Sequence, residues 1–523
     1  MILEKNIIQK NPLKTKIRIG LTYPNIYKTA MSSLGFQLLY NLINERDDSW
    51  CERIIYPEIR SIESNSPLKD FDIISFSIQY EQDYFNVLEM LKLSEIPLKR
   101  EDRKENHPLI IAGGPCTSSN PLPLSDYIDL FIIGDGEIVT NELLDLYENL
   151  DNPRENIGEF SKIKGIYVSE LNNPTKICIN NMDSIYHNVY PLIVETENKD
   201  YLPVFNNSIF LNVSRGCTRG CRFCMSSFMY RPLRETNLEK LFEIAEKSRE
   251  NSGFNKVNLI GTAVGDYSKL DELINGLKER NFEVSTPSLR MESLNLETLS
   301  ALKESGLKTL TIAPESIYTL RKDINKDISD KLIETVIKDA LNLNLKLKLY
   351  FLIGLPNENE KSIKELANYI KYLNDLDIKK NSISFSINPT IPKANTPLQW
   401  DQYHLNSIKK KIKYLKKELK NINIKFESGK MGLIQYVLSC GGKEVGKLVA
   451  KSLDEKVLIK EWEKYIPNYN YNSTLPWHNI NIGLKSNFLK EERKKISLSE
   501  TTPWCGANKC YNCGSCENNK KRL

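Results

Sequence analysis

Apolar runs and amphipathic segments alternate through the N-terminal third of the chain. Four continuous apolar runs predict buried strands, at residues 16–24, 71–78, 108–115 and 128–137. Apolar residues at helical spacing predict helices over residues 32–46, 83–93 and 139–150. Strands that are apolar throughout and separated by helices indicate a parallel sheet covered on both faces. We therefore expect an α/β domain with a doubly wound parallel sheet over residues 14–150.

A second series of strand and helix signals begins near residue 206. Its first predicted strand leads into Cys217, and the later ones lie at residues 256–261, 282–289, 307–315, 345–356 and 382–392. Segments with helical spacing separate the strands, for example at residues 238–248 and 296–305. Six such units are too few for a closed eight-stranded barrel. The pattern predicts an open, partial (β/α)6 barrel over residues 206–402.

Two polar regions complete the pattern. Residues 151–205 are rich in Asn and Pro and are predicted to form a connector, with a short strand pair at residues 163–170 and 175–181. Residues 403–523 are predicted to form a helical, lysine-rich region that ends in a cysteine-rich segment.

Composition places the chain among globular proteins. A length of 523 residues suggests two or three domains, and 40% hydrophobic with 27% charged residues is typical of a folded protein. No apolar run approaches the roughly 20 residues that span a bilayer, and the N-terminus has no apolar signal region. We expect a cytoplasmic protein without membrane attachment. The net charge of +5 is small, and lysine runs such as residues 409–425 favour a solvated helix face over a nucleic-acid surface.

Cysteine usage indicates metal binding. Seven of the eleven cysteines lie in two tight groups, a pattern that points to metal rather than disulfides. The first group, Cys217, Cys221 and Cys224, has the spacing Cys-x3-Cys-x2-Cys. Its three thiolates could form a zinc site with a distant histidine, or bind three irons of a [4Fe–4S] cluster and leave the fourth iron open. The histidines are few, and none is close in sequence: His107, His187, His404 and His478.

The segment "CTRGCRFC" resembles the cluster loop of the radical S-adenosylmethionine (SAM) superfamily. This resemblance implies that the open iron chelates the amino and carboxylate groups of SAM, and that Phe223 packs near the adenine. One electron, from a donor such as ferredoxin or flavodoxin, would then cleave SAM to a 5′-deoxyadenosyl radical. That radical removes hydrogen from an unactivated C–H bond.

Later strand ends match the same family in order. The resemblance implies that Asp266, in "LIGTAVGDYS", contacts the SAM amino group, and that Arg290, in "TPSLRME", contacts its carboxylate. It assigns Glu315, in "TIAPES", to the ribose hydroxyls or the amino group. The glycine–proline turn of residues 350–358 would border the adenine. The alternative for each charged residue is an ordinary surface position at a strand end.

Glycine loops follow the third and fourth strands of the N-terminal sheet, at Gly113, Gly114, Gly134 and Gly136. They resemble the Rossmann-type, cobalamin-binding-like domain found before many radical SAM cores, and glycines allow close approach of a large ligand. The alternative is a pair of tight turns without a ligand. The Asp-x-His-x-x-Gly motif of one group of corrinoid proteins is absent. Water or no ligand is therefore expected below the cobalt of a bound cobalamin.

The second cysteine group lies near the end of the chain, in "CGANKCYNCGSC". Its four thiols predict a second metal site, formed by Cys505, Cys510, Cys513 and Cys516. Zinc, mononuclear iron and an iron–sulfur cluster all remain open, as do a structural role and an electron-relay role.

Three further segments extend the resemblance over nearly the whole chain, at residues 387–400, 475–492 and 501–516. Together they resemble a branch of radical SAM proteins with a cobalamin-binding-like domain. The chain is therefore expected to be a radical SAM enzyme that uses a [4Fe–4S] cluster, SAM and cobalamin to methylate a protein or RNA substrate. One alternative is a radical SAM enzyme without cobalamin, for another C–H modification or sulfur insertion. A second is a non-catalytic iron–sulfur or zinc module for electron transfer or nucleic-acid binding, which would not need the series of SAM contacts.

Overall fold

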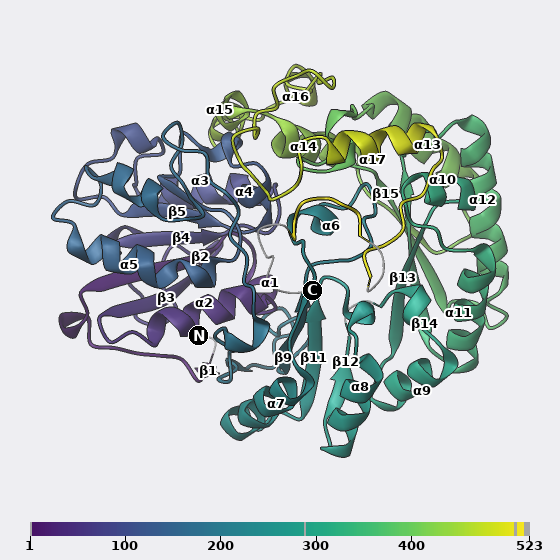
Figure 1. Cartoon of the computed structure of the whole chain (residues 1–523), viewed down its shortest axis with the longest axis horizontal. Helices are drawn as coiled ribbons and strands as arrows, with labels where there is room; N and C mark the ends of the chain where they lie inside the picture. The colour runs from purple at the N-terminus through teal and green to yellow at the C-terminus, as the bar shows by residue number, and fades with distance from the viewer. Residues whose placement is uncertain (1–2, 287–288, 507–509, 517–523) are drawn as a thin grey trace.

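A computed structural model describes residues 3–286, 289–506 and 510–516 of the chain (Figure 1). Its N-terminal part contains a six-stranded sheet in the order β3-β2-β4-β5-β6-β7. The strands are β2 (Ile17–Tyr23), β3 (Ser49–Ile55), β4 (Ile73–Ser77), β5 (Leu109–Gly113), β6 (Leu130–Ile132) and β7 (Ile166–Tyr167). Five of them are parallel, and β7 runs antiparallel to β6. The chain moves outward from β2 to β3 and then back across to β4, which is the predicted doubly wound order.

Helices cover both faces of this sheet. They are α1 (Tyr27–Ala30), α2 (Leu34–Asn44), α3 (Asp83–Leu93), α4 (Pro115–Ser119) and α5 (Thr140–Asn149). Neighbouring strand residues point to opposite faces, so Ile73 packs in the apolar cluster of α2 and α5, and Ile74 packs in that of α3. This two-sided burial explains why the strands are apolar throughout.

Two further sheets form the second series, in the orders β10-β9-β11-β12 and β13-β14-β15-β16. Their strands are β9 (Ile209–Arg215), β10 (Arg234–Glu235), β11 (Lys256–Gly261), β12 (Glu283–Ser285), β13 (Thr309–Glu315), β14 (Lys346–Ile353), β15 (Ile383–Pro389) and β16 (Ile424–Phe426). All pairs except β9 with β10 are parallel. The prediction of an open α/β arrangement is confirmed. Within the described ranges no ladder joins β12 to β13, so the six predicted strands are divided between two sheets.

Amphipathic helices follow these strands and bury one face against them. They are α7 (Leu238–Ser252), α8 (Leu270–Glu279), α9 (Leu296–Glu304), α10 (Tyr318–Asp323), α11 (Asp330–Asn342) and α12 (Glu360–Asp375). Figure 1 shows this series beside the N-terminal sheet, with the short α6 (Ser226–Met229) between them.

The C-terminal region is mostly helical, as predicted. Its helices are α13 (Leu405–Glu418), α14 (Gly429–Cys440), α15 (Lys443–Lys451), α16 (Ile459–Glu463) and α17 (Phe488–Ser497). The prediction was wrong at β16, which pairs with β15 as a seventh parallel strand. Because β16 has three residues and is not fully buried, it carries too few apolar positions to give a strand pattern.

The predicted strand pair of the connector is also wrong. Residues 166–167 form β7, which pairs with β6, and Ile177 forms a bridge to Gly134 just beyond β6. Both segments therefore extend the N-terminal sheet instead of pairing with each other. Further along the connector, β8 (Ile193–Glu195) pairs antiparallel with β1 (Leu3–Lys5).

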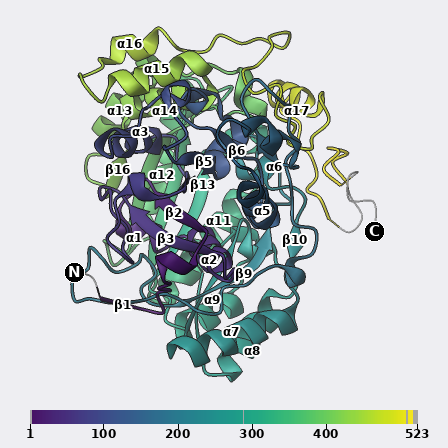
Figure 2. The ribbon, with the colours of Figure 1, turned by 90° about the vertical axis from the view of Figure 1, so that its left-hand side faces the viewer.

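One apolar core runs from the α3 face of the N-terminal sheet into the second series and the C-terminal helices. The contact with α15 is close, since a Cβ atom on Gly446 would lie 2.2 Å from the carbonyl oxygen of Pro123. Asn120 donates to the carbonyls of Ser439 and Gly441 at 3.0 and 2.8 Å. Figure 2 shows α15 and α16 above α3. The domain boundaries at residues 150, 205 and 402 stay predictions.

No helix in the described part of the chain is long and apolar enough to cross a membrane.

Candidate functional site

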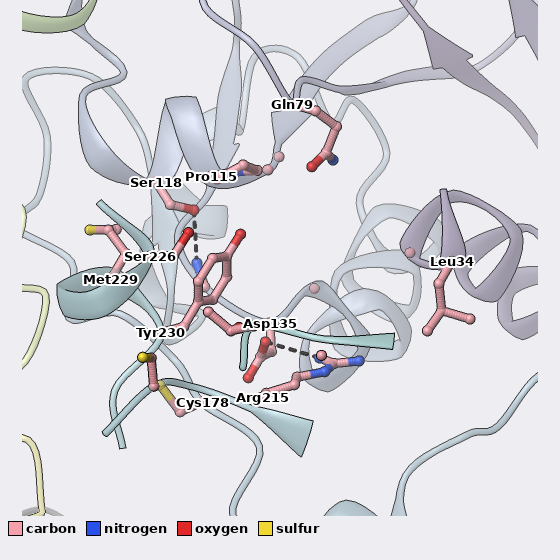
Figure 3. Close-up of a pocket in the computed structure, with 18 of the residues that line it drawn as sticks. Leu34, Gln79, Pro115, Ser118, Asp135, Cys178, Arg215, Ser226, Met229 and Tyr230 are labelled. Atoms are coloured by element: carbon pink, nitrogen blue, oxygen red, sulfur yellow. Dashed lines mark hydrogen bonds and ion pairs between the residues drawn. The ribbon is translucent and has the colours of Figure 1, made fainter. Parts of the chain in front are cut away.

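A cavity of about 660 Å³ lies between the N-terminal sheet and the beginning of the second series (Figure 3). Its walls combine the ends of β4, β5 and β6 and the start of α2 with the segment that follows β9. Ligands of doubly wound sheets bind beyond the carboxyl ends of the strands. The cavity occupies this position and extends from there to the cysteines of residues 217–224.

The cluster loop, residues 216–225, follows directly from β9. Gly216 has a φ of 95°, and a Cβ atom there would lie 2.3 Å from the carbonyl oxygen of Pro232, so the turn requires glycine. Cys217 and Cys221 are buried, Cys224 is partly buried, and all three line the cavity. The turn at Gly216 therefore directs the predicted cluster ligands into the cavity.

The three thiols are close enough to affect one another's ionisation. Burial is the main cause that raises the pKa of each thiol, and a neighbouring thiol adds to it in every case. Arg290 and Lys326 act in the opposite direction on the pKa of Cys221. Since a metal ligand must be a thiolate, these two cations favour the ligand form. In the described ranges no three His, Cys, Asp or Glu side chains are already gathered in the geometry of a metal site.

Phe223 lies between Cys221 and Cys224 and reaches two cavities. It packs against the apolar group of Leu320, Ile324 and Leu355. Phe223 lines the main cavity, and it also lines a second cavity of about 440 Å³ beside β15 and α14. The ring thus forms part of the wall between the cysteines and a second open space.

Arg290 and Glu315 line the main cavity together with the cysteines. Arg290 donates from Nη2 to Glu292 at 2.7 Å, whereas its buried Nε has no hydrogen-bond partner and lies 3.9 Å from a carboxylate oxygen of Asp266. Glu315 ends β13 after a register shift, has a φ of 65°, and accepts a hydrogen bond from Lys326 Nζ at 2.7 Å. Left-handed backbone in a non-glycine residue is strained, and such strain concentrates at functional sites. Both residues therefore have features that a bound ligand would explain.

Asp266 has a different environment. Arg219 of the cluster loop binds its carboxylate with two hydrogen bonds, from Nε at 3.0 Å and from Nη2 at 2.7 Å. Asp266 is not among the residues that line the cavity. The structure thus brings Phe223, Arg290 and Glu315 to the cavity with the cysteines, whereas Asp266 contacts Arg219 and Arg290 without lining the cavity itself. Its predicted contact with SAM stays a prediction.

Comparison with known proteins identifies the family. A family model for "Radical SAM proteins, N-terminal" matches residues 35–169, and one for the "Radical SAM superfamily" matches residues 211–370. An uncharacterised protein of Methanocaldococcus jannaschii, MJ0966, is 32% identical over 454 residues, which are 85% of this chain and 94% of that protein. The chain belongs to the radical SAM superfamily. This radical SAM enzyme therefore uses a [4Fe–4S] cluster and SAM and needs a reductant, as predicted.

Other relatives are more distant. Cytidylyl-2-hydroxyethylphosphonate methyltransferase of Streptomyces wedmorensis is 26% identical over 35% of each chain. Ribosomal protein uS12 methylthiotransferase RimO of Chlorobium phaeobacteroides is 23% identical over 31% of this chain and 39% of RimO. The solved structure of OxsB, a cobalamin-dependent SAM radical enzyme with aqua-cobalamin bound, aligns with a TM-score of 0.50 and 14% identity. That alignment covers 92% of this chain and 72% of OxsB and reflects the same fold.

The four predicted glycines all line the cavity of the radical SAM enzyme, but two have a packing role of their own. Gly114 and Gly134 each have a φ of 116°. Cβ atoms there would lie 2.3 Å from the Ile78 carbonyl and 2.1 Å from the Ile177 carbonyl, respectively. Cβ atoms on Gly113 and Gly136 would make only ordinary contacts, at 3.7 Å and 3.9 Å. A ligand role for the glycines stays a prediction.

Sequence reasoning missed an ion cluster at the junction of the two halves. Asp135, between Gly134 and Gly136, accepts hydrogen bonds from Arg215 at 3.0 Å and Arg234 at 2.9 Å (Figure 3). Glu137 accepts from Arg215 at 2.6 Å. Burial by itself would raise the pKa of Asp135, but the two guanidinium groups hold it below its usual value. An acidic pair inside a glycine loop, "GDGE", was the available sequence signal.

Further polar residues of the wall carried no sequence signal. Figure 3 shows Gln79 from the segment after β4, Ser118 from α4, Cys178 from the connector and Tyr230 from the segment after α6 around the same space. Burial raises the pKa of Tyr230 to about 12, so its hydroxyl stays protonated near neutral pH.

The four C-terminal cysteines lie near one another and beside the cluster loop of the radical SAM enzyme. The thiols of Cys513, Cys505 and Cys510 all raise the pKa of Cys516, after the larger effect of its burial. The backbone N–H of Cys505 donates to the carbonyl of Thr218 at 2.9 Å. The predicted second metal at these thiols stays a prediction.

Proposed function

We propose that this radical SAM enzyme transfers a methyl group to an unactivated carbon of a protein or RNA substrate, with cobalamin bound in the cavity beyond the N-terminal sheet. One observation carries the proposal: a single cavity joins the carboxyl edge of that sheet to Cys217, Cys221 and Cys224. A methyl donor held at the sheet and a hydrogen-abstracting group held at the cysteines would therefore share one space. The cluster and SAM supply hydrogen abstraction when bound, and cobalamin supplies the methyl group.

The donor set suits the cluster and SAM. Three thiols on one loop leave one iron without a protein ligand. Arg290, whose Nε has no hydrogen-bond partner, and Glu315, whose backbone is strained, line the same cavity. A guanidinium suits the carboxylate of SAM, and a carboxylate suits ribose hydroxyls or an ammonium. The ring of Phe223 offers an apolar wall for the adenine.

The cavity also suits a large flat ligand. Apolar atoms make up most of the exposed wall, and polar and charged side chains from both halves of the protein also line it, a mixture that suits a cofactor with apolar and polar parts. A neighbouring cavity of about 610 Å³ shares Lys176, Ile177 and Cys178 with it, so a ligand larger than one cavity has room to extend. No histidine is among the described lining residues, which fits a corrinoid without a histidine ligand below the cobalt.

The substrate class rests on relatives. RimO acts, by its name, on a ribosomal protein, and the phosphonate enzyme is a methyltransferase. We infer the methyl transfer from the second and the macromolecular substrate from the first. We also infer a cytoplasmic location with ferredoxin or flavodoxin as electron donor, because reduced thiols require a reducing compartment. The likeness to RimO also favours a second candidate, insertion of sulfur without cobalamin.

The test uses anaerobically reconstituted protein incubated with hydroxocobalamin and freed of unbound corrinoid. Dithionite, SAM with an isotopically labelled methyl group and a cell extract free of small molecules are then added. We expect bound corrinoid in the absorption spectrum, 5′-deoxyadenosine, and label in a macromolecular fraction that protease or ribonuclease releases. Mass spectrometry of the released fragment then distinguishes a methyl from a methylthio group.

Two variants control the test. Cys217→Ala should abolish 5′-deoxyadenosine, whereas Cys51→Ala, a cysteine buried in the N-terminal core, should retain it. Formation of 5′-deoxyadenosine without corrinoid retention would overturn the cobalamin proposal and favour sulfur insertion. Absence of 5′-deoxyadenosine in the presence of a complete cluster would overturn both.

A further inference from the structure

The segment that carries the C-terminal cysteines lies directly on the cluster loop. The structure describes residues 501–506 and 510–516 of this segment, here named the cysteine segment. The amide of Cys505 donates to the Thr218 carbonyl at 2.9 Å, and the hydroxyl of Tyr511 donates to the Arg219 carbonyl. The guanidinium of Arg219 stacks on Trp504 at 3.9 Å. These contacts cover the outer side of the cluster loop, away from the cavity.

A buried arginine inside the cluster motif holds the beginning of the same segment. Arg222, between Cys221 and Phe223, is fully buried. It donates to Glu492 of α17 at 3.0 Å, to the Glu500 carbonyl at 2.8 Å and to the Thr502 hydroxyl at 3.2 Å. The carboxylate of Glu492 neutralises the charge of Arg222, so Arg222 holds the segment without a further anionic partner.

A second arginine between the two cysteine groups has no such balance. Arg231 is 4% exposed and forms no ion pair with a carboxylate of the described residues. Its Nε donates to the Ser227 carbonyl at 2.6 Å, its Nη2 is buried without a nitrogen or oxygen partner, and its side chain lies within hydrogen-bonding reach of the Cys513 thiol. The guanidinium lies 4.3 Å from the centre of the Tyr511 ring, and a Cβ atom on Gly220 would be 2.9 Å from Nη2. A buried cation without a counter-charge is costly, and the Cys513 thiol is the group beside Arg231 that can become an anion.

The backbone of the cysteine segment has tight turns between its cysteines, which suit a metal-binding loop. Asn512 has a φ of 56° and Gly514 a φ of 94°, conformations that these two residue types tolerate best. The amide of Asn512 donates to Cys510 Sγ at 3.2 Å, an arrangement that stabilises a thiolate. Cys513 is buried in an apolar cluster with Phe228 and Phe488, whereas Cys510 and Cys516 are exposed.

We propose that Cys505, Cys510, Cys513 and Cys516 bind one zinc ion in a closed four-thiolate site, which fastens the cysteine segment over the cluster loop. Four thiolates around a divalent ion form a net anionic centre, and this centre, through Cys513, supplies a counter-charge for Arg231. Ligand spacings of two and four residues match those of structural zinc sites, which have no open position. Zinc does not change oxidation state, so the site stabilises the cluster loop and relays no electron.

The first experiment measures metal in the whole protein. We expect one zinc ion per chain, beyond the iron of one cluster, by elemental analysis of the wild-type protein. The double variant Cys510→Ser/Cys516→Ser changes two exposed side chains and should lose this zinc while it still folds, as circular dichroism can check. Cys51→Ser, which changes a buried cysteine of the N-terminal core outside both groups, should retain the zinc and serves as the control.

The same variants test the fastening role. Loss of the iron–sulfur absorption band under a chelator should be about tenfold faster in the double variant, the lower end of the effect of changing groups around a metal site. This readout does not depend on methyl transfer, so it can fail while the proposed function stands. Unchanged cluster stability after loss of the zinc would overturn the fastening role. A second reduced-cluster signal in electron paramagnetic resonance that disappears in the double variant would overturn the zinc assignment, as would absence of any additional metal.

A second pair of variants tests Arg231. Arg231→Gln should lower zinc affinity about 10- to 100-fold in competition with a chromogenic chelator, whereas Arg231→Lys, which keeps the charge, should lower it less. Arg280→Gln removes an arginine that stacks on Phe242 far from both cysteine groups, and should leave zinc affinity unchanged. Equal affinity in all three variants would overturn the role of Arg231. If Arg231→Gln fails to fold, the comparison of Arg231→Lys with Arg280→Gln remains. A lower zinc affinity in Arg231→Lys would support the role of Arg231, and equal affinities would overturn it.

Discussion

At the scale of single residues, two residues of the cavity wall have unusual local features. Arg290 has a buried Nε without a hydrogen-bond partner, and Glu315 holds a left-handed backbone conformation. Both belong to strand ends that family resemblance assigned to SAM. The structure adds a physical reason for that assignment, because unmet hydrogen-bonding capacity and local strain are tolerated where a ligand compensates for them.

We expect Arg290→Gln to weaken SAM binding. Loss of a hydrogen bond between two charged groups costs about 1.5–3 kcal/mol, or roughly 10- to 100-fold in Kd. Isothermal titration of the reconstituted protein measures the effect. Arg249→Gln, on the outer helix α7, should bind SAM as the wild type does. Equal Kd values for the two variants would contradict a contact between Arg290 and SAM.

The four glycines can be separated by their space requirements. Gly114→Ala and Gly134→Ala force a Cβ atom into a neighbouring carbonyl at positive φ, so each should destabilise the protein by about 1–3 kcal/mol. Gly113→Ala and Gly136→Ala meet only ordinary contacts and should change stability by no more than about 1 kcal/mol. Thermal unfolding followed by circular dichroism compares the pairs. A loss of corrinoid retention in Gly113→Ala at unchanged melting temperature would indicate direct contact with the ligand.

At the scale of secondary-structure elements, the loop after β6 connects the two halves of the protein. Asp135 of this loop is held by Arg215, at the end of β9, and by Arg234, in β10. The cluster loop starts directly after Arg215, so the position of the predicted cluster ligands depends on a carboxylate from the N-terminal sheet. This ion cluster couples the two walls of the cavity.

Asp135→Asn should loosen this junction. Removing one partner of a buried ion pair costs about 3–5 kcal/mol, and here it leaves two buried guanidinium groups with less counter-charge. Hydrogen exchange measured by mass spectrometry should increase at both β9 and the loop after β6. Lys69→Met, which removes an exposed ion pair with Glu95 in the same half, should leave exchange at these segments unchanged. No increase in Asp135→Asn would show that packing alone holds the junction.

The sequence predicted the long elements well because their patterns are strong. Strands such as β14, of eight residues, and amphipathic helices such as α12 carry enough apolar positions to be recognised. It did not predict β3, because Glu52 and Arg53 interrupt the apolar residues of its sequence "SWCERII". These two charged residues are buried because Glu52 pairs with Arg18 and Arg53 pairs with Glu63. It did not predict β16, which is too short. The cysteines were found from their spacing, whereas Asp135 and Arg231 depend on contacts between distant segments that no local pattern records.

At the scale of the whole molecule, the cavity belongs to neither half alone. Leu34 lines it from the start of α2 (Figure 3), and Arg290, from the segment after β12, also lines it. A change on one wall should therefore affect one ligand and spare the other.

We expect Leu34→Trp to reduce corrinoid retention while 5′-deoxyadenosine is still formed, because the larger side chain fills the sheet side of the cavity. Absorption spectroscopy after gel filtration measures the first effect and chromatography of the nucleoside the second. Leu296→Trp, also at the first position of a helix but exposed on α9, serves as the control and should change neither. Loss of both corrinoid retention and 5′-deoxyadenosine formation in Leu34→Trp would mean that the two ligands do not occupy separate parts of the cavity.

The cover of the cluster loop has a consequence for the order of events in the cell. The ribosome makes Cys217 to Cys224 long before it makes Trp504 and Tyr511, which close over them. At typical synthesis rates of about 5–20 residues per second, the interval is roughly 15–55 s. During this interval the cluster loop lacks the cover that Trp504 and Tyr511 provide. Synthesis of residues 504–511 would then end a period of easier access to the cysteines, so translation itself would time the maturation of the enzyme.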